Sequence, residues 1–327
     1  MKYFKHSNAS SVDEAISQLK DHKRKAALIA GGTDLLGILK TEILPDYPEA
    51  LINLKTISGL DYIREDDEGV RIGATTKLAL IARSFIINGN YSVLGRSAES
   101  VGTPEIRQMG TIGGNLCQDN RCWYYRYPHT LGGRILCFRK GKGPCHALKG
   151  DNRYHAIFGG KGCFAVCPSD ISVALTALDA KITVAGPDGE RTIPITDLYG
   201  TVGHTLETDE ILTEIQIPKP PYGAAQTFIK FRLRESVDFA VVSVASVISV
   251  AEGICRDARI VMGGVAPTPC RATDAEDVIK GKHLDAKVAE DAAEAAVRNA
   301  KPLSKNAYKI EITKTLVKRT LLDSAHP

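Results

Sequence analysis

The sequence predicts an α+β fold in which two α/β sub-domains precede a separate C-terminal α+β domain. Helical and strand patterns alternate through the first part of the chain, which is typical of layered α/β units. A proline-rich stretch, 218–221, marks a boundary, and beyond it long strand patterns precede helical ones. We therefore expect sub-domains at residues 1–55 and 56–220 and the C-terminal domain at residues 221–327.

The first sub-domain is predicted as strands joined by helices. Apolar residues recur at helical spacing from Val12 to Leu19, and Ser11 supplies an N-cap oxygen with Glu14 three residues on. The following segments predict a strand at 26–30, a glycine turn at 31–34, a helix at 35–40 and a strand at 50–54.

Regular structure continues on both sides of a long irregular segment. The second sub-domain is predicted to hold a strand at 69–74, a helix at 78–86, a helix at 171–178, and strands at 181–185 and 191–195. In the C-terminal domain we expect strands at 225–233, 239–250 and 256–262, and helices through the last sixty residues, which are rich in Ala, Lys and Glu.

The segment 117–167 has no clear periodicity and gathers most of the cysteines. A structureless stretch of this length inside a compact domain needs a reason, and a metal centre supplies one. Cytosolic cysteines gathered in this way serve metal binding or redox chemistry more often than disulfides. Residues 121–161 also carry nine Lys or Arg against one acid, Asp151. Six of the eight cysteines fall here: Cys117, Cys122, Cys137, Cys145, Cys163 and Cys167.

Composition excludes several other classes of protein. A formal charge of +4 on 327 residues does not indicate nucleic acid or a membrane surface as a partner. No apolar run reaches the roughly 18 residues that span a bilayer. The N-terminus lacks the apolar core of a secretory signal, so we expect a cytoplasmic protein.

Two glycine pairs, Gly31-Gly32 and Gly113-Gly114, suggest a phosphate cradle. Glycine lets the backbone approach a ligand closely, and a helix N-terminus just after such a turn attracts phosphate. Each turn has a hydroxyl neighbour, Thr33 or Thr111. Neither is a GxGxxG fingerprint or a Walker motif, so a Rossmann NAD site and a P-loop are not indicated. A purely structural turn remains the alternative for each pair.

Three motifs in order carry a family resemblance: Ile29–Leu35, Arg107–Asn115 and Gly263–Pro267. They resemble those of the FAD-binding medium subunits of the molybdenum hydroxylases, the family of xanthine dehydrogenase and carbon monoxide dehydrogenase. The resemblance covers essentially the whole chain. It implies a vanillyl-alcohol-oxidase-like (PCMH-type) FAD-binding domain of two α/β sub-domains and a C-terminal α+β domain.

The resemblance also implies which residues contact FAD. Asp170 has an alternative role as the N-cap of the helix at 171–178, and Lys230 has one as a solvated strand residue. Valine at position 101 cannot stack on a flavin ring as an aromatic residue would. The implied contacts are Ile29, Ala30, Gly31, Gly32, Thr33, Asp34, Leu35, Leu36, Val101, Thr111, Ile112, Gly113, Gly114, Asn115, Asp170, Leu212 and Lys230.

The cysteine-rich segment is an insertion relative to most of that family. It resembles the loop that carries a [4Fe-4S] cluster in 4-hydroxybenzoyl-CoA reductase and in bacterial aldehyde oxidoreductases. Cys167, followed by Pro168, imitates the end of a ferredoxin motif and is the alternative fourth ligand. Zinc is the alternative metal, although the middle cysteines lack the paired spacing of zinc knuckles. The ligands implied by the match are Cys122, Cys137, Cys145 and Cys163.

These resemblances imply an electron-relay flavoprotein rather than a chain with its own substrate chemistry. We expect no catalytic residue here, because no paired-carboxylate or Ser/His/Asp constellation stands out. The expected partners are a large subunit with the molybdenum cofactor and a small [2Fe-2S] subunit, with ferredoxin or another carrier outside the complex. Aldehyde oxidation and 4-hydroxybenzoyl-CoA reduction both remain open. The rival functions are a stand-alone flavin oxidase and a non-catalytic iron–sulfur scaffold.

Overall fold

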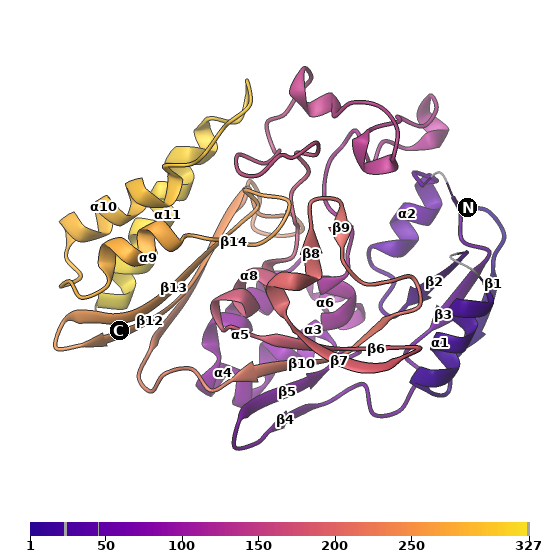
Figure 1. The fold of residues 1–327 in the computed structure, drawn as a ribbon, viewed down its shortest axis with the longest axis horizontal. Helices are drawn as coiled ribbons and strands as arrows, with labels where there is room; N and C mark the ends of the chain where they lie inside the picture. Colours follow the sequence, from indigo (N-terminus) through magenta and orange to yellow (C-terminus); the bar gives the residue numbers. More distant parts are fainter. Residues whose placement is uncertain (23–24, 45, 326–327) are drawn as a thin grey trace.

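The computed structural model describes residues 1–22, 25–44 and 46–325, which build three sheets and a small two-stranded ribbon. Helices lie against each sheet, and the cysteine-rich insertion, in magenta, runs along the top of the view (Figure 1). No helix in these residues is both long and apolar enough to cross a membrane.

The first sheet is parallel and lies at the N-terminal end of the molecule. Parallel strands need a crossover, and two short helices supply it. The predicted cap of the first helix is confirmed, because Ser11 Oγ accepts a hydrogen bond from the backbone N–H of Glu14 at 3.1 Å. The elements are β1 (Lys5–Asn8), α1 (Val12–Asp21), β2 (Ala26–Ile29), α2 (Leu35–Thr41) and β3 (Ala50–Asn53), in the sheet order β1-β3-β2.

The second sheet is antiparallel and has the order β4-β5-β10-β6-β7. Strands far apart in the sequence pair here, since the central strand β10 joins β5 on one side and β6 on the other. A separate two-stranded ribbon follows β7. The strands are β4 (Ile63–Glu65), β5 (Gly69–Gly73), β6 (Lys181–Gly186), β7 (Gly189–Pro194), β8 (Tyr199–Gly200), β9 (Gly203–His204) and β10 (Ile211–Pro218).

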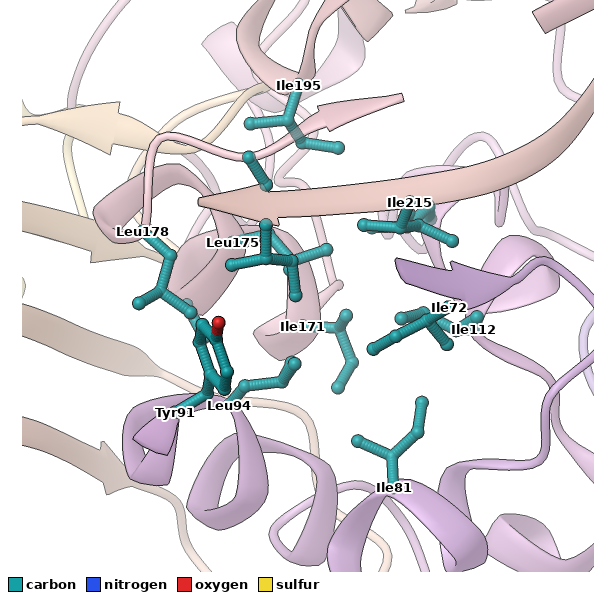
Figure 2. Packing of buried hydrophobic residues seen from close by; sticks show 14 of the residues in the cluster. Ile72, Ile81, Tyr91, Leu94, Ile112, Ile171, Leu175, Leu178, Ile195 and Ile215 are labelled. Atoms are coloured by element: carbon teal, nitrogen blue, oxygen red, sulfur yellow. The ribbon is translucent and has the colours of Figure 1, made fainter. Parts of the chain in front are cut away.

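Short helices cover this sheet and build the main core with it. Figure 2 shows side chains of strands β5 and β10, such as Ile72 and Ile215, packed with those of the covering helices, such as Ile171. The predicted single helix at 78–86 is wrong, because Ser84 takes an extended conformation and caps a new helix through Ile87 N–H. The helices are α3 (Leu78–Arg83), α4 (Phe85–Asn90), α5 (Ser92–Glu99), α6 (Pro104–Met109), α7 (Ile112–Leu116) and α8 (Asp170–Ala177), with a 3-10 turn η4 (Ile195–Leu198) after β7.

The third sheet and three helices form the C-terminal part. Residues 232–241, partly predicted as strand, form a loop between β11 and β12 that reaches the candidate site. The predicted helical stretch runs to Ala325, and residues 326–327 lie outside the described part. The elements are β11 (Ala225–Phe231), β12 (Val242–Ala251), β13 (Ile254–Gly263), β14 (Cys270–Arg271), α9 (Thr273–Ile279), α10 (Ala286–Val297) and α11 (Tyr308–Ala325).

The insertion is irregular, as predicted, but it is attached to the rest of the fold at its base and at its far side. An antiparallel bridge joins Arg121 to Val166 at the base of the loop. At the far side, the fully buried Lys309 of α11 donates hydrogen bonds to the carbonyls of Tyr154 and His155 at 3.2 and 3.1 Å. Its only regular pieces are the 3-10 turns η1 (His129–Leu131), η2 (Phe138–Lys140) and η3 (His146–Leu148).

Candidate functional site

The two glycine turns of the sequence meet in the structure. A Cβ added to Gly31 would stand 2.2 Å from the carbonyl oxygen of Met109 and 2.8 Å from the Cα of Gly110. Gly32 has a φ of 69°, which side chains rarely adopt. The first turn therefore packs backbone to backbone against the residues that lead into the second turn.

The second turn opens a short helix that lies between two cavities. Thr111 caps α7, since its Oγ accepts a hydrogen bond from Gly114 N–H at 3.2 Å. One cavity, of about 170 Å³, lies beside α6 and β11, and we call it the flavin cavity. The other, of about 340 Å³, lies beside β2 and β10, and we call it the nucleotide cavity. Both are lined by Thr111 and Gly114, so the two cavities adjoin at the start of α7, and we refer to them together as the cleft.

The cleft gathers most of the residues implied by the family resemblance. The flavin cavity is lined by Thr33, Asp34, Val101, Thr111, Gly114, Asn115, Asp170 and Lys230 from that set. The nucleotide cavity is lined by Ala30, Thr111, Gly113, Gly114 and Leu212. The remaining implied residues line neither cavity: Ile29, Gly31, Gly32, Leu35, Leu36 and Ile112.

Asp170 and Lys230 form a buried ion pair at the wall of the flavin cavity. Lys230 Nζ lies 2.6 Å from Asp170 Oδ2, and each side chain is 5% exposed. Ser169, not Asp170, caps α8, because its Oγ accepts from Ser172 N–H at 3.0 Å. The N-cap alternative for Asp170 is therefore wrong, as is the solvated alternative for Lys230. Asp170 is the first residue of α8, where the helix dipole favours a negative charge.

Asp34 links the first glycine turn to the cysteine-rich insertion. Its carboxylate lies 2.9 Å from both Arg121 and Arg126 and accepts a hydrogen bond from Asp119 N–H at 3.0 Å. Burial acts to raise the pKa of Asp34, but the two guanidinium groups outweigh it and hold that pKa below its usual value. The sequence analysis did not single out these two arginines as partners of Asp34. Their position on either side of Cys122, in a loop with few acidic residues, could have marked them as candidates.

Three thiols of the insertion, those of Cys122, Cys145 and Cys163, are near enough to act on one another electrostatically. Burial raises the pKa of Cys122 to about 11, and the neighbouring Cys145 and Cys163 add to this effect. Burial and Cys145 also raise the pKa of Cys163. Cys137 packs in a small buried cluster with Cys122 and Tyr125. Each cysteine of the predicted ligand set therefore has at least one other member of the set as a neighbour.

Cys167 lies in different surroundings from these four thiols. Its Sγ is 3.7 Å from Ser172 Oγ, and the charged groups that act on its pKa are Asp170 and Arg121 rather than another cysteine. In the described ranges no three His, Cys, Asp or Glu side chains are grouped so that they could hold one metal ion. In a [4Fe-4S] cluster each thiolate binds a different iron, so its four sulfurs stand further apart than the ligands of one ion.

His155 is buried against the first of these cysteines. Its Nε2 lies 3.2 Å from Cys122 Sγ, and the side chain is 2% exposed. Burial and the neighbouring Lys309 lower the pKa of His155 to about 4, so the ring is neutral near pH 7. The backbone N–H of Tyr125 also points at Cys122 Sγ, at 3.5 Å. Donors directed at a sulfur stabilise its thiolate form.

The fold and the cleft define an FAD-binding flavoprotein. The family described as FAD binding domain in molybdopterin dehydrogenase matches residues 2–220, and the CO dehydrogenase flavoprotein C-terminal domain matches residues 226–324. The predicted PCMH-type fold is confirmed. The chain belongs to the family of FAD-binding medium subunits of the molybdenum hydroxylases, and it is the FAD subunit of a multi-subunit oxidoreductase.

Individual relatives span nearly the whole chain. The aldehyde oxidoreductase FAD-binding subunit PaoB of Escherichia coli (strain K12) is 34% identical over 90% of this chain and 89% of the relative. The carbon monoxide dehydrogenase medium chain of Afipia carboxidovorans is 30% identical over 86% and 81%. A solved carbon monoxide dehydrogenase structure from Hydrogenophaga pseudoflava superposes with a TM-score of 0.79 at 26% identity, covering 99% of this chain and 97% of that one.

Proposed function

We propose that this chain relays electrons between FAD in the cleft and a [4Fe-4S] cluster in the insertion. When bound, FAD exchanges electrons in pairs, whereas the cluster exchanges them singly. The observation that supports the proposal is that Cys122 has Cys145, Cys163 and Cys137 as neighbours and stands between Arg121 and Arg126, which pair with Asp34. Those ion pairs join the segment around Cys122 to the first glycine turn.

The cleft residues fit FAD by their backbone geometry and charge. The glycine turn Gly31-Gly32 lets the backbone approach a diphosphate closely, because neither residue carries a side chain. The N–H groups of Ile112 and Gly113 at the start of α7 are already bonded to the carbonyls of Thr76 and Ala74. The Asp170–Lys230 pair supplies a fixed carboxylate and ammonium at the wall where an isoalloxazine ring would lie. The complete proposed set is Ile29, Ala30, Gly31, Gly32, Thr33, Asp34, Leu35, Leu36, Val101, Thr111, Ile112, Gly113, Gly114, Asn115, Asp170, Leu212 and Lys230.

The insertion fits a thiolate-bound cluster by its charge and its burial. Arg139, only 3% exposed at its side chain, acts electrostatically on Cys163, and Lys140 does so on Cys137. These cations offset the negative charge that four thiolates bring into a poorly solvated loop. Cys163 rather than Cys167 is proposed as the fourth ligand, because Cys163 is the one placed among the other thiols.

The proposed complex contains a large molybdenum subunit and a small [2Fe-2S] subunit. The relative named as an aldehyde oxidoreductase subunit supports aldehyde oxidation over 4-hydroxybenzoyl-CoA reduction for the whole assembly. Because the relatives of this chain are subunits of larger oxidoreductases, we favour a subunit role over the two rival functions, a stand-alone flavin oxidase and a non-catalytic iron–sulfur scaffold. Ferredoxin or another acidic carrier could exchange electrons at the insertion, where basic residues alternate with exposed apolar ones such as Leu136 and Phe138.

Purification of the native complex followed by cofactor analysis tests this function. We expect molybdenum, FAD and acid-labile sulfide in one assembly, and bleaching of the flavin absorbance when an aldehyde is added. Cys122→Ser should lower iron and sulfide in this subunit, whereas Cys270→Ser, a matched change outside the insertion, should not. A native protein without molybdenum or a larger partner would refute the subunit role.

A further inference from the structure

His155 lies in the insertion with its ring directed at Cys122, one of the four proposed cluster ligands. The ring Nε2 stands 3.2 Å from Cys122 Sγ, and the His155 side chain is 2% exposed. A sulfur that is bound to iron carries no proton, so the hydrogen of this contact comes from the ring, as Nε2–H. The contact is therefore an N–H···S hydrogen bond whenever the thiolate of Cys122 holds iron.

The other ring nitrogen of His155 indicates that the ring is held for this contact with the sulfur. Nδ1 is buried and has no hydrogen-bond partner among the residues that the structure describes. A buried polar atom without a partner destabilises a fold, and a phenylalanine ring would fill the same space without that cost. The imidazole therefore has its polar contact through Nε2, on the side of Cys122.

Two aromatic rings hold the imidazole of His155 in this orientation. The ring centroids of Trp123 and Tyr124 lie 5.6 and 5.9 Å from the centroid of the imidazole. Both neighbours are fixed in turn, because Trp123 Nε1 and the Tyr124 hydroxyl donate hydrogen bonds to the carbonyl of Asp151 at 3.0 and 3.1 Å. The packing of these two rings restricts rotation of the imidazole away from the sulfur.

The C-terminal domain fixes the backbone of His155. The carbonyl of His155 accepts hydrogen bonds from Asn306 Nδ2 and from Lys309 Nζ, both at 3.1 Å. Both donor side chains belong to fully buried residues, and Lys309 also donates to the carbonyl of Gly264 at 2.6 Å. Asn306 and Lys309, around the start of α11, are therefore positioning residues for His155.

We propose that His155 raises the reduction potential of the cluster by donating a hydrogen bond to Cys122 Sγ. The inference rests on the proposed function, because it needs the cluster that Cys122 would bind. Reduction adds one electron to the cluster and makes its sulfurs more negative, so a donor directed at a sulfur stabilises the reduced form more than the oxidised form. The backbone N–H of Tyr125, 3.5 Å from the same sulfur, acts in the same direction.

A redox titration of the full-length chain, followed by the electron paramagnetic resonance of the reduced cluster, measures this potential. His155→Phe keeps a flat ring and removes the donor. We expect it to lower the equilibrium constant for reduction about tenfold, which is about 59 mV for one electron. His155→Gln should restore most of this loss, because its amide nitrogen can replace Nε2 as donor. His129→Phe is the matched control, since His129 is an exposed residue of the same insertion, and its potential should equal that of the unaltered chain.

Two results with a folded His155→Phe chain would overturn the inference. One is a full content of iron and sulfide together with the potential of the His129→Phe control. The other is loss of iron with an unchanged circular dichroism spectrum, which would give His155 a role in holding the cluster rather than in setting its potential.

If His155→Phe loses its circular dichroism signal, the unaltered chain with isotope-labelled histidine nitrogens decides. The paramagnetic resonance of its reduced cluster must show the weak nitrogen coupling of a hydrogen bond. Absence of any coupling, or the strong coupling of a nitrogen bound to iron, would overturn the inference. An unaltered chain without iron and sulfide refutes the proposed function, and this inference with it, whereas an unchanged potential in His155→Phe leaves the proposed function standing.

Discussion

Replacing Lys230 by methionine should destabilise the chain strongly, because it leaves Asp170 as an unpaired charge in the wall of the flavin cavity. The two side chains are each 5% exposed and their charged atoms are 2.6 Å apart. Removing one member of a buried pair costs about 3–5 kcal/mol. The N-terminus of α8 offsets about 0.3–1 kcal/mol of this for Asp170. We therefore expect the free energy of unfolding to fall by about 3 kcal/mol.

Urea unfolding of the full-length chain at a fixed FAD concentration measures this loss. Lys25→Met is the control, because Lys25 and Glu49 are 2.7 Å apart, nearly the same separation, but each side chain is 62% exposed. That control should show no measurable change. The double variant Asp170→Asn/Lys230→Met should recover part of the loss, since it leaves no unpaired charge. If Lys230→Met behaves like Lys25→Met, the buried pair does not have the role assigned to it.

Three further results are expected. Gly31→Ala should abolish FAD retention, read as flavin absorbance per chain, because its Cβ would clash with Met109 at 2.2 Å, whereas Gly37→Ala has open space and should retain FAD. Cys163→Ser should lose iron and sulfide while Cys167→Ser keeps them, and the reverse result would make Cys167 the fourth ligand. Asp34 should contribute stability above its ordinary pKa of 3.8 and lose it as the pH falls through the lower folded pKa. Urea unfolding at pH 6 and pH 3 should therefore show Asp34→Asn losing less stability on acidification than the unaltered chain, and equal losses would contradict the ion pairs.

The fold was predictable where local chemistry decides it. Ser11 begins the first helix because a hydroxyl oxygen caps it, and the glycine turns stand where only glycine fits. The break at Ser84 was missed although serine is a good cap, because the apolar spacing ran on through it. Residues 234–238 were correctly left outside the predicted strands, but the ends of the loop at 232–241 were missed, because Phe239, Ala240 and Val241 look like the start of a strand.

The site was predictable only in part, because several of its contacts join distant residues. The glycine turns and the cysteines could be found from motifs. The pairing of Asp34 with Arg126 spans 92 positions, and no local pattern predicts which arginine reaches which carboxylate. The same holds for Lys230 and Asp170, which stand 60 positions apart. Such an ion pair contributes to the site only when it is buried, and whether it is buried depends on the whole fold.

Cofactor analysis of the purified full-length chain tests the central claim most directly. A chain that relays electrons between FAD and a [4Fe-4S] cluster should contain about one FAD, about four iron atoms and about four acid-labile sulfides. Cys122→Ser should lower the iron and sulfide and leave the FAD in place, because the thiols and the cleft are separate sites. A chain that carries FAD with a single zinc and no sulfide would contradict the account.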